Sequence, residues 1–219
     1  MTNKKCVILV HGIFTRDNST KNIDRISPAF KENGYDIRVA RVGFSSIFGT
    51  TIAFANLIES TRRAIDRAMR AGYKKIVCVG HSNGCALLHM ASYKVNPELA
   101  KHVKLKYIYI NAALNERFHP AACVDYLDVY YAPDDWIVWM SQALGWVIPW
   151  GKMGKVGYNG PPFPTCSVKN YDMQLLPLLD PEGNPINLKR LGHNDIFDKP
   201  QPVLAFSKAI AKNADSHFS

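Results

Sequence analysis

Apolar runs alternate with segments of helical period along the whole chain. Six short runs rich in valine, isoleucine, leucine and tyrosine are separated by stretches in which apolar residues recur every three or four positions. This alternation predicts a parallel β-sheet whose strands are joined by crossover helices. Several of the runs are continuously apolar, which is typical of strands covered on both faces. The predicted strands are residues 5–10, 35–42, 75–79, 105–111, 126–131 and 165–171.

The segments between these runs predict amphipathic helices. Ile23, Ile26 and Phe30 lie on one face of a short helix that Gly34 can end in a left-handed conformation. A long loop is predicted over 151–164, which is rich in glycine and proline. The apolar faces of the other three helices are formed by Leu57, Ile58, Ile65 and Met69, by Leu87, Met90 and Ala91, and by Val203, Phe206 and Ile210.

The composition fits a single globular domain over residues 1–219. Hydrophobic residues make up 47% of the chain, enough for a substantial core. The apolar run near the N-terminus is too short for a signal peptide or a transmembrane span. The five cysteines are scattered, lie mostly within apolar runs and lack the spacing of a metal site. We therefore expect buried thiols, no metal or other cofactor, and a cytoplasmic location.

The formal net charge of +9 suits an anionic partner such as a nucleic acid or a lipid surface. Part of this charge lies on one side of the helix predicted over 53–71. Pairs four residues apart, Glu59 with Arg63 and Asp66 with Arg70, predict a solvated face. No aromatic residues interleave with these charges, as base stacking would require, so no specific nucleic-acid partner is expected. The basic residues of this side are Arg63, Arg67, Arg70 and Lys74.

A serine stands between two glycines where a predicted strand gives way to a predicted helix, in the stretch "GHSNG". A serine hydroxyl is a nucleophile only when it is exposed, next to a base, and near donors for the developing oxyanion. A sharp turn would expose Ser82, and its crowding favours glycine at Gly80 and Gly84. The N-terminus of the following helix directs amides at the developing charge. Ser82 is therefore a candidate nucleophile rather than only a turn residue.

A second candidate element is "VHGIF", at the end of the first predicted strand. Gly12 allows close backbone approach, so that the amide of Ile13 can point into the site beside that of Asn83. We expect these two amides to form an oxyanion hole. His11 is expected to shape this loop rather than to react.

A candidate acid and a candidate base follow along the chain. The stretch "PDDWIV" ends a strand and offers Asp135, with Asp134 as the alternative whose other role is turn formation. Among the seven histidines, His193 in "LGHNDI" lies in a loop ahead of the last helix, from which an imidazole can reach a sheet edge. His81 is expected to pack beneath the turn. The order Ser82, Asp135, His193 matches one of the known triad arrangements.

With these four motifs in order, the chain resembles the α/β-hydrolase family over nearly its whole length, in particular its compact lipases and esterases. The resemblance implies a three-layer α/β fold with a mostly parallel sheet of about six strands flanked by helices, a minimal form lacking the first two strands of the family's sheet. It also implies a serine-dependent, metal-independent carboxylester hydrolase acting on a small or lipid-like acyl ester through an acyl-enzyme. In it, Ser82 attacks the acyl carbonyl, His193 relays the proton, and Asp135 orients and stabilises the imidazolium.

All four tryptophans lie between residues 136 and 150, just after the candidate acid. The surrounding segment, 136–164, is either a lid or acyl-pocket wall, or a crossover helix packing on the sheet. Phe14, Trp136 and Trp139 are the candidate substrate contacts. An exposed aromatic face, together with the positive charge, would favour weak contact with an anionic membrane surface.

Other functions use the same residues. A thioesterase, an amidase or a peptidase would share this triad, because a triad fixes the reaction type and not the leaving group. A non-catalytic binding protein of the same fold is a further hypothesis, but it predicts a degraded triad position and none is evident. The sequence leaves the oligomeric state and the physiological substrate open.

Overall fold

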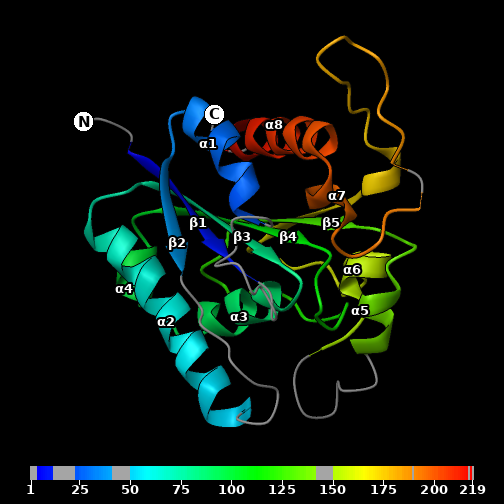
Figure 1. Ribbon diagram of the computed structural model, residues 1–219. Helices are drawn as coiled ribbons and strands as arrows, with labels where there is room; N and C mark the ends of the chain where they lie inside the picture. The colour runs from blue at the N-terminus through cyan, green and yellow to red at the C-terminus, as the bar shows by residue number, and fades with distance from the viewer. Residues whose placement is uncertain are drawn as a thin grey trace.

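The computed structural model contains a six-stranded parallel sheet in the order β2-β1-β3-β4-β5-β6 (Figure 1). It describes residues 4–11, 23–40, 50–141, 150–188, 190–216 and 218. All six predicted strands are present, and their described bounds closely match the prediction. The strands are β1 (Lys5–Val10), β2 (Asp36–Ala40), β3 (Lys75–His81), β4 (Lys104–Ile110), β5 (Tyr126–Tyr131) and β6 (Ser167–Asp172).

Helices cover both faces of the sheet, so the fold has three layers (Figure 1). Within β1, Cys6, Ile8 and Val10 pack in one core cluster, while Val7 and Leu9 pack in the other. Alternate side chains of a strand point to opposite faces, and burial on both faces explains the continuously apolar runs. One face is covered by α2 (Thr50–Arg70) and α3 (Asn83–Ser92), and the other by η1 (Ile23–Ile26), α1 (Ser27–Glu32) and α8 (Pro200–Ser216).

The predicted helices are present, and several short ones accompany them. Gly34 ends the first predicted helix with φ +76°, and the following amide of Tyr35 bonds to the carbonyl of Phe30 at 3.0 Å. This is the left-handed cap expected from the glycine. The short elements are α4 (Pro97–Ala100), α5 (Trp136–Ser141), α6 (Met153–Val156), η3 (Met173–Leu175) and α7 (Asp195–Asp198).

The segment predicted as a loop over 151–164 contains α6 and docks against the chain that follows β4. A Cβ on Gly151 would lie 2.5 Å from Cα of Asn115, and one on Gly154 would lie 2.3 Å from the carbonyl carbon of Asn111. The Gly154 amide donates to the carbonyl of Ala112 at 2.8 Å. The glycines here therefore allow this segment's backbone to lie directly on the backbone that follows β4.

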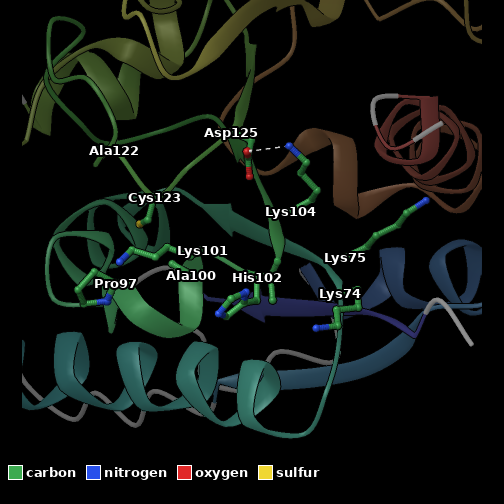
Figure 2. Close-up of a pocket in the computed structure, with 11 residues that line it drawn as sticks. Lys74, Lys75, Pro97, Ala100, Lys101, His102, Lys104, Ala122, Cys123 and Asp125 are labelled. Atoms are coloured by element: carbon green, nitrogen blue, oxygen red, sulfur yellow. Dashed lines mark hydrogen bonds and ion pairs between the residues drawn. The ribbon is translucent and has the colours of Figure 1, made fainter. Parts of the chain in front are cut away.

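A cavity of about 730 Å³ lies at the edge of the sheet where β3, β4 and β5 begin (Figure 2). Its walls carry four lysines, of which three already have partners. Lys75 Nζ donates to the carbonyl of Phe218 at 2.9 Å, Lys101 pairs with Glu98 at 2.7 Å, and Lys104 pairs with Asp125 at 3.4 Å. None of the candidate catalytic residues lines this cavity.

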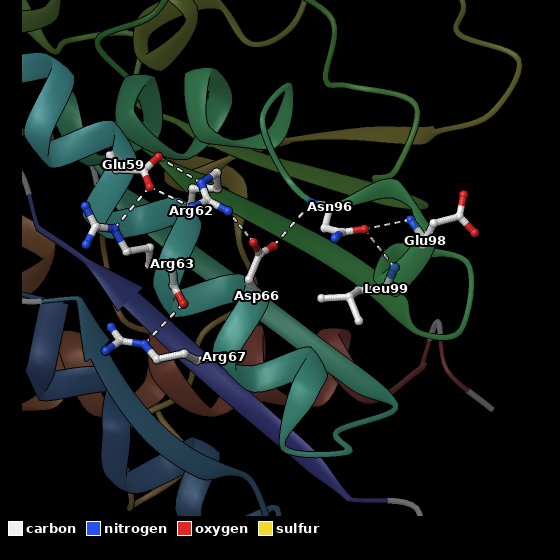
Figure 3. Close-up of polar contacts among 8 residues, drawn as sticks. All are labelled: Glu59, Arg62, Arg63, Asp66, Arg67, Asn96, Glu98 and Leu99. Carbon is white, nitrogen blue, oxygen red and sulfur yellow. Dashed lines mark hydrogen bonds and ion pairs between the residues drawn. The ribbon is translucent and has the colours of Figure 1, made fainter.

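The charged side of α2 is solvated as predicted, but one of its predicted pairs is wrong. Arg63 pairs with Glu59 at 3.1 Å, as expected. Asp66, however, pairs with Arg62 and not with Arg70, and also accepts the backbone amide that precedes α4 at 3.3 Å (Figure 3). Asp66 is buried on the side of α2 that faces α4. To pair with the exposed Arg70, its carboxylate would have had to point outward into solvent. The carboxylate therefore ties α2 to α4.

The five cysteines are free thiols, four of them buried and Cys123 half-buried. Burial raises the pKa of Cys6 and of Cys166 to about 12. Across the described part of the chain, no helix is both long enough and apolar enough to span a bilayer.

Candidate active site

Three of the candidate residues follow the carboxyl ends of strands in the parallel sheet. His11 follows β1, Ser82 follows β3, and Asp135 lies shortly after β5. β1 and β3 are adjacent although β2 separates them in the chain, so the strand order reverses between them. Open α/β sheets bind ligands at the carboxyl edge near such a switch point. The topology therefore gathers these residues at the edge where a ligand is expected.

Ser82 occupies a strained turn between β3 and α3. Its φ is +55° and its ψ is −125°, a conformation that residues with a side chain rarely adopt. Its amide donates to the carbonyl of Ile110 at 3.0 Å, and its carbonyl accepts the amides of Cys85 at 3.1 Å and Ala113 at 3.2 Å. These bonds hold the strained backbone, and the serine is half-buried rather than enclosed.

The two glycines beside Ser82 are required by close backbone contacts. A Cβ on Gly80 would lie 2.9 Å from the amide nitrogen of Cys85. One on Gly84 would lie 2.3 Å from the carbonyl oxygen of Val10 and 2.7 Å from that of His11. Gly84 thus lets α3 begin directly against the end of β1. The proposed oxyanion donor Ile13 and the substrate contact Phe14 follow this point and lie outside the described residues.

His193 and Asp135 are in direct contact. His193 Nδ1 and Asp135 Oδ2 are 2.6 Å apart, and Asp135 Oδ1 accepts the Val138 amide at 3.0 Å. Because a carboxylate oxygen only accepts, Nδ1 carries a proton, and the neutral tautomer that this contact selects has its lone pair on Nε2. Asp135 is fully buried, whereas Asp134 is exposed and accepts from Gln174 at 2.8 Å. Of the two aspartates in the turn, Asp135 is the one that contacts the histidine.

Two further side chains hold the His193 loop over the serine turn. The carbonyl of His193 accepts from Asn111 Nδ2 at 2.8 Å and from His81 Nε2 at 3.2 Å. The rings of His81 and His193 are 4.9 Å apart. Burial lowers the pKa of His81 to about 3, so its ring is neutral and carries the proton on Nε2. Among the described hydrogen bonds, none joins Ser82 to His193 directly.

The sequence did not indicate that Asn111 holds the carbonyl of His193, and it predicted only that His81 packs beneath the turn. Asn111 directly follows β4 and has φ +46°, a conformation that asparagine tolerates better than most residues. An asparagine straight after a buried strand was the available signal, but its partner is 82 positions away in sequence. The partner could not be found without the fold.

Cys85 lies three residues after Ser82 but is not a competing nucleophile. It is buried, and its thiol contacts the carbonyl of Ile110 at 3.8 Å. Burial raises the pKa of this thiol well above its ordinary value, so the reactive thiolate is not populated.

The tryptophans after Asp135 differ in position and, where it is described, in exposure. Trp136 begins α5 immediately after Asp135 and is 60% exposed, with Ile137 beside it 39% exposed. Trp139 lies in α5. Trp150, which the prediction placed only in the aromatic cluster, donates its indole N–H to Asn83 Oδ1 at 2.5 Å.

The sheet order, the helices on both faces and the serine turn together define the α/β-hydrolase fold. Comparison with solved structures agrees: a protein of the alpha/beta hydrolase superfamily from Xanthomonas campestris pv. campestris has a TM-score of 0.57 at 13% identity, with 97% of this chain and 99% of that chain covered. Lipase B of Aspergillus fumigatus has a TM-score of 0.56 at 14% identity, covering 90% of this chain and 50% of that chain. A fungal esterase from Rhizomucor miehei has a TM-score of 0.58 at 10% identity, covering 98% of this chain and 75% of that chain. No protein-family model and no curated protein sequence matches the chain.

Proposed function

We propose that this protein hydrolyses carboxylic esters through an acyl-enzyme formed on Ser82. The observation that carries the proposal is the 2.6 Å contact of His193 with Asp135 at the same sheet edge as the strained turn of Ser82. The lipase and the esterase with the same fold support an ester as the substrate class. A strained serine, a histidine and a buried carboxylate are the parts of a serine hydrolase.

In the first half-reaction, Ser82 Oγ attacks the ester carbonyl. His193 Nε2 takes the hydroxyl proton while the Oγ–C bond forms and the carbonyl electron pair moves onto oxygen. The oxyanion lies at the N-terminus of α3, where the Asn83 amide can donate to it, with Ile13 as the proposed second donor. Asp135 holds the imidazole by Nδ1 and stabilises its positive charge.

The oxyanion then collapses and breaks the bond to the alkoxy leaving group. This group takes the proton from His193 Nε2 and departs as the alcohol. A water molecule next gives a proton to the same nitrogen and attacks the acyl carbon, forming a second oxyanion. This oxyanion collapses and breaks the bond to Ser82 Oγ, which takes the proton back from His193 Nε2 as the carboxylic acid leaves. The exposed Trp136 and Ile137 would border the acyl chain beside Asp135.

Hydrolysis of p-nitrophenyl butyrate tests this proposal. Wild-type protein is expected to turn the ester over, and Ser82→Ala to lose at least about 10³-fold in kcat. Ser167→Ala is the matched control, because Ser167 is an exposed serine at the start of β6. Equal turnover by Ser82→Ala and wild type would refute the assignment, and butyryl thioesters run in parallel separate an esterase from a thioesterase.

A further inference from the structure

The cavity at the amino-terminal edge of the sheet combines apolar and basic walls (Figure 2). Its volume of about 730 Å³ lies in the range of small-molecule sites in proteins. Ala100, Val103 and Cys123 line it and are partly buried against the core, and the exposed Pro97 and Ala122 complete its apolar part. Burial raises the pKa of the Cys123 thiol to about 11, so this thiol is neutral and adds no charge to the apolar wall.

Three lysines provide the charge of the cavity. Lys74 and Lys104 lie at the starts of neighbouring strands, where the Lys104 amide donates to the Lys74 carbonyl at 2.8 Å. Lys101 follows α4 directly. The fourth lysine of the walls, Lys75, donates to the carbonyl of Phe218 at 2.9 Å, and Figure 2 shows its side chain running away from that of Lys101. Its ammonium group is therefore committed elsewhere.

The ammonium groups of the three lysines are available to a ligand. Lys74 is exposed and has no side-chain hydrogen bond or ion pair among the described residues. The side chains of Lys101 and Glu98, which pair with each other, are 63% and 74% exposed. Lys104 is 61% exposed in its pair with Asp125, the one carboxylate in the described walls. Exposed ion pairs contribute little to stability because water and salt screen them, so an incoming anion can exchange for these partners.

The two kinds of wall favour one kind of ligand. A concave surface with an excess of one charge attracts ions of the opposite sign, and an apolar wall is stabilised when an apolar group covers it. We propose that this cavity is a binding site for an amphipathic anion, such as a fatty-acid carboxylate. The anionic head pairs with Lys74 and Lys104, and the apolar tail covers Ala100 and Val103.

The cavity and the candidate active site lie at opposite ends of β3. The strand begins at Lys75, in the wall of the cavity, and ends at His81, next to Ser82. A strand rises about 3.3 Å per residue, so its length separates the two places by roughly 20 Å. A ligand in the cavity therefore does not occupy the position of an ester at Ser82, and the inference does not rest on the proposed ester hydrolysis.

Three related ligands test the inference by isothermal titration calorimetry. Octanoate has both an anionic head and an apolar tail, 1-octanol has the same tail with a neutral head, and acetate has the same head with almost no tail. We expect octanoate to bind at one site, and octanol and acetate to bind about tenfold more weakly or worse. In ¹⁵N-labelled protein, octanoate should shift the amide resonances of Val103 and Ala122 and leave those of Ser82 and Asn83 in place.

Variants of the walls place the ligand. Lys74→Gln removes the ammonium group that has no partner and should weaken octanoate binding about threefold or more. Ala122→Trp fills the cavity from an exposed position and should weaken it about tenfold or more; Ala122→Leu replaces this variant if it does not fold. Lys208→Gln removes the same charge from an exposed position on α8 and should leave the affinity unchanged.

Several results would overturn the inference. Wild-type protein that does not bind octanoate has no such site, and equal affinity for octanoate and octanol would show that the charge has no part in binding. Full affinity in the filled variant, or resonance shifts confined to Ser82 and Asn83, would place the ligand elsewhere. Equal weakening in Lys74→Gln and Lys208→Gln would reduce the effect to net charge. Each of these results leaves the proposed ester hydrolysis standing, because Ser82-dependent turnover is measured separately.

Discussion

Replacing Asp135 with asparagine tests the proposed histidine–carboxylate couple with little change of shape. The asparagine oxygen can still accept the Val138 amide, which Asp135 accepts at 3.0 Å. The NH₂ group then faces His193 Nδ1, which now has to accept. The imidazole proton moves to Nε2, and the ring can no longer take the proton of Ser82.

The size of the effect follows from this change of tautomer. In serine hydrolases, a wrong tautomer of the base costs up to about 10⁴ in kcat, which corresponds to roughly 5 kcal/mol of activation free energy. The contact replaced here is fully buried and only 2.6 Å long, so water cannot restore the original tautomer. We expect kcat of Asp135→Asn to fall by about 10³- to 10⁴-fold, with KM changing little.

The neighbouring aspartate provides the control. Asp134→Asn makes the same substitution one residue earlier, where the carboxylate is exposed and bonds only to Gln174 among the described residues. Its kcat on p-nitrophenyl butyrate should stay within about twofold of wild type. Asp135 does not orient the imidazole if Asp135→Asn keeps more than a tenth of the activity, or if Asp134→Asn loses as much as Asp135→Asn.

Three further predictions concern the turn, the buried histidines and the histidine loop. Gly84→Ala would place a Cβ 2.3 Å from the Val10 carbonyl oxygen and should lower the free energy of unfolding, measured with urea, by about 2–3 kcal/mol. Gly183→Ala is the control: its Cβ would have no atom within 4 Å, so only its φ of +86° should lower the free energy of unfolding, by about 1 kcal/mol. Equal losses in the two variants would contradict the clash. Burial lowers the pKa of His81 to about 3 and of His89 to about 4, so unfolding takes up protons below the unfolded value of 6.5. The free energy of unfolding should therefore fall on acidification from about pH 6.5 to about pH 4, by roughly 1 kcal/mol per pH unit for each histidine, and a flat urea-denaturation profile would count against this. Asn111→Asp turns a donor into an acceptor opposite the carbonyl it holds and should lower kcat about tenfold or more, whereas unchanged kcat would show that this bond does not position the base.

The strands of the sheet could be predicted because each is marked by a short run of apolar residues in the sequence. Strands buried on both faces are mostly apolar, as Val7 to Val10 and Ile76 to Val79 are, and the shortness of these runs favours strands over buried helices. Gly80 and Gly84 were also predictable, because any side chain there meets backbone in a turn this sharp.

The contacts that orient the site could not be predicted in the same way. The choice of Asp135 over Asp134 depends on which carboxylate faces a histidine 58 positions later in the chain. The pairing of Asp66 with Arg62 depends on α4 covering it, and a four-residue spacing rule contains no information about α4. The bond between Asn83 and Trp150 likewise depends on how residues 150–156 dock, which glycine spacing alone does not specify.

Labelling with a fluorophosphonate, followed by mass spectrometry of the peptides, tests most directly whether Ser82 is an activated nucleophile. We expect one phosphonyl adduct on the peptide that contains Ser82, absent from Ser82→Ala and formed far more slowly in Asp135→Asn. An adduct on another residue, or labelling of Ser82→Ala at the wild-type rate, would contradict this expectation.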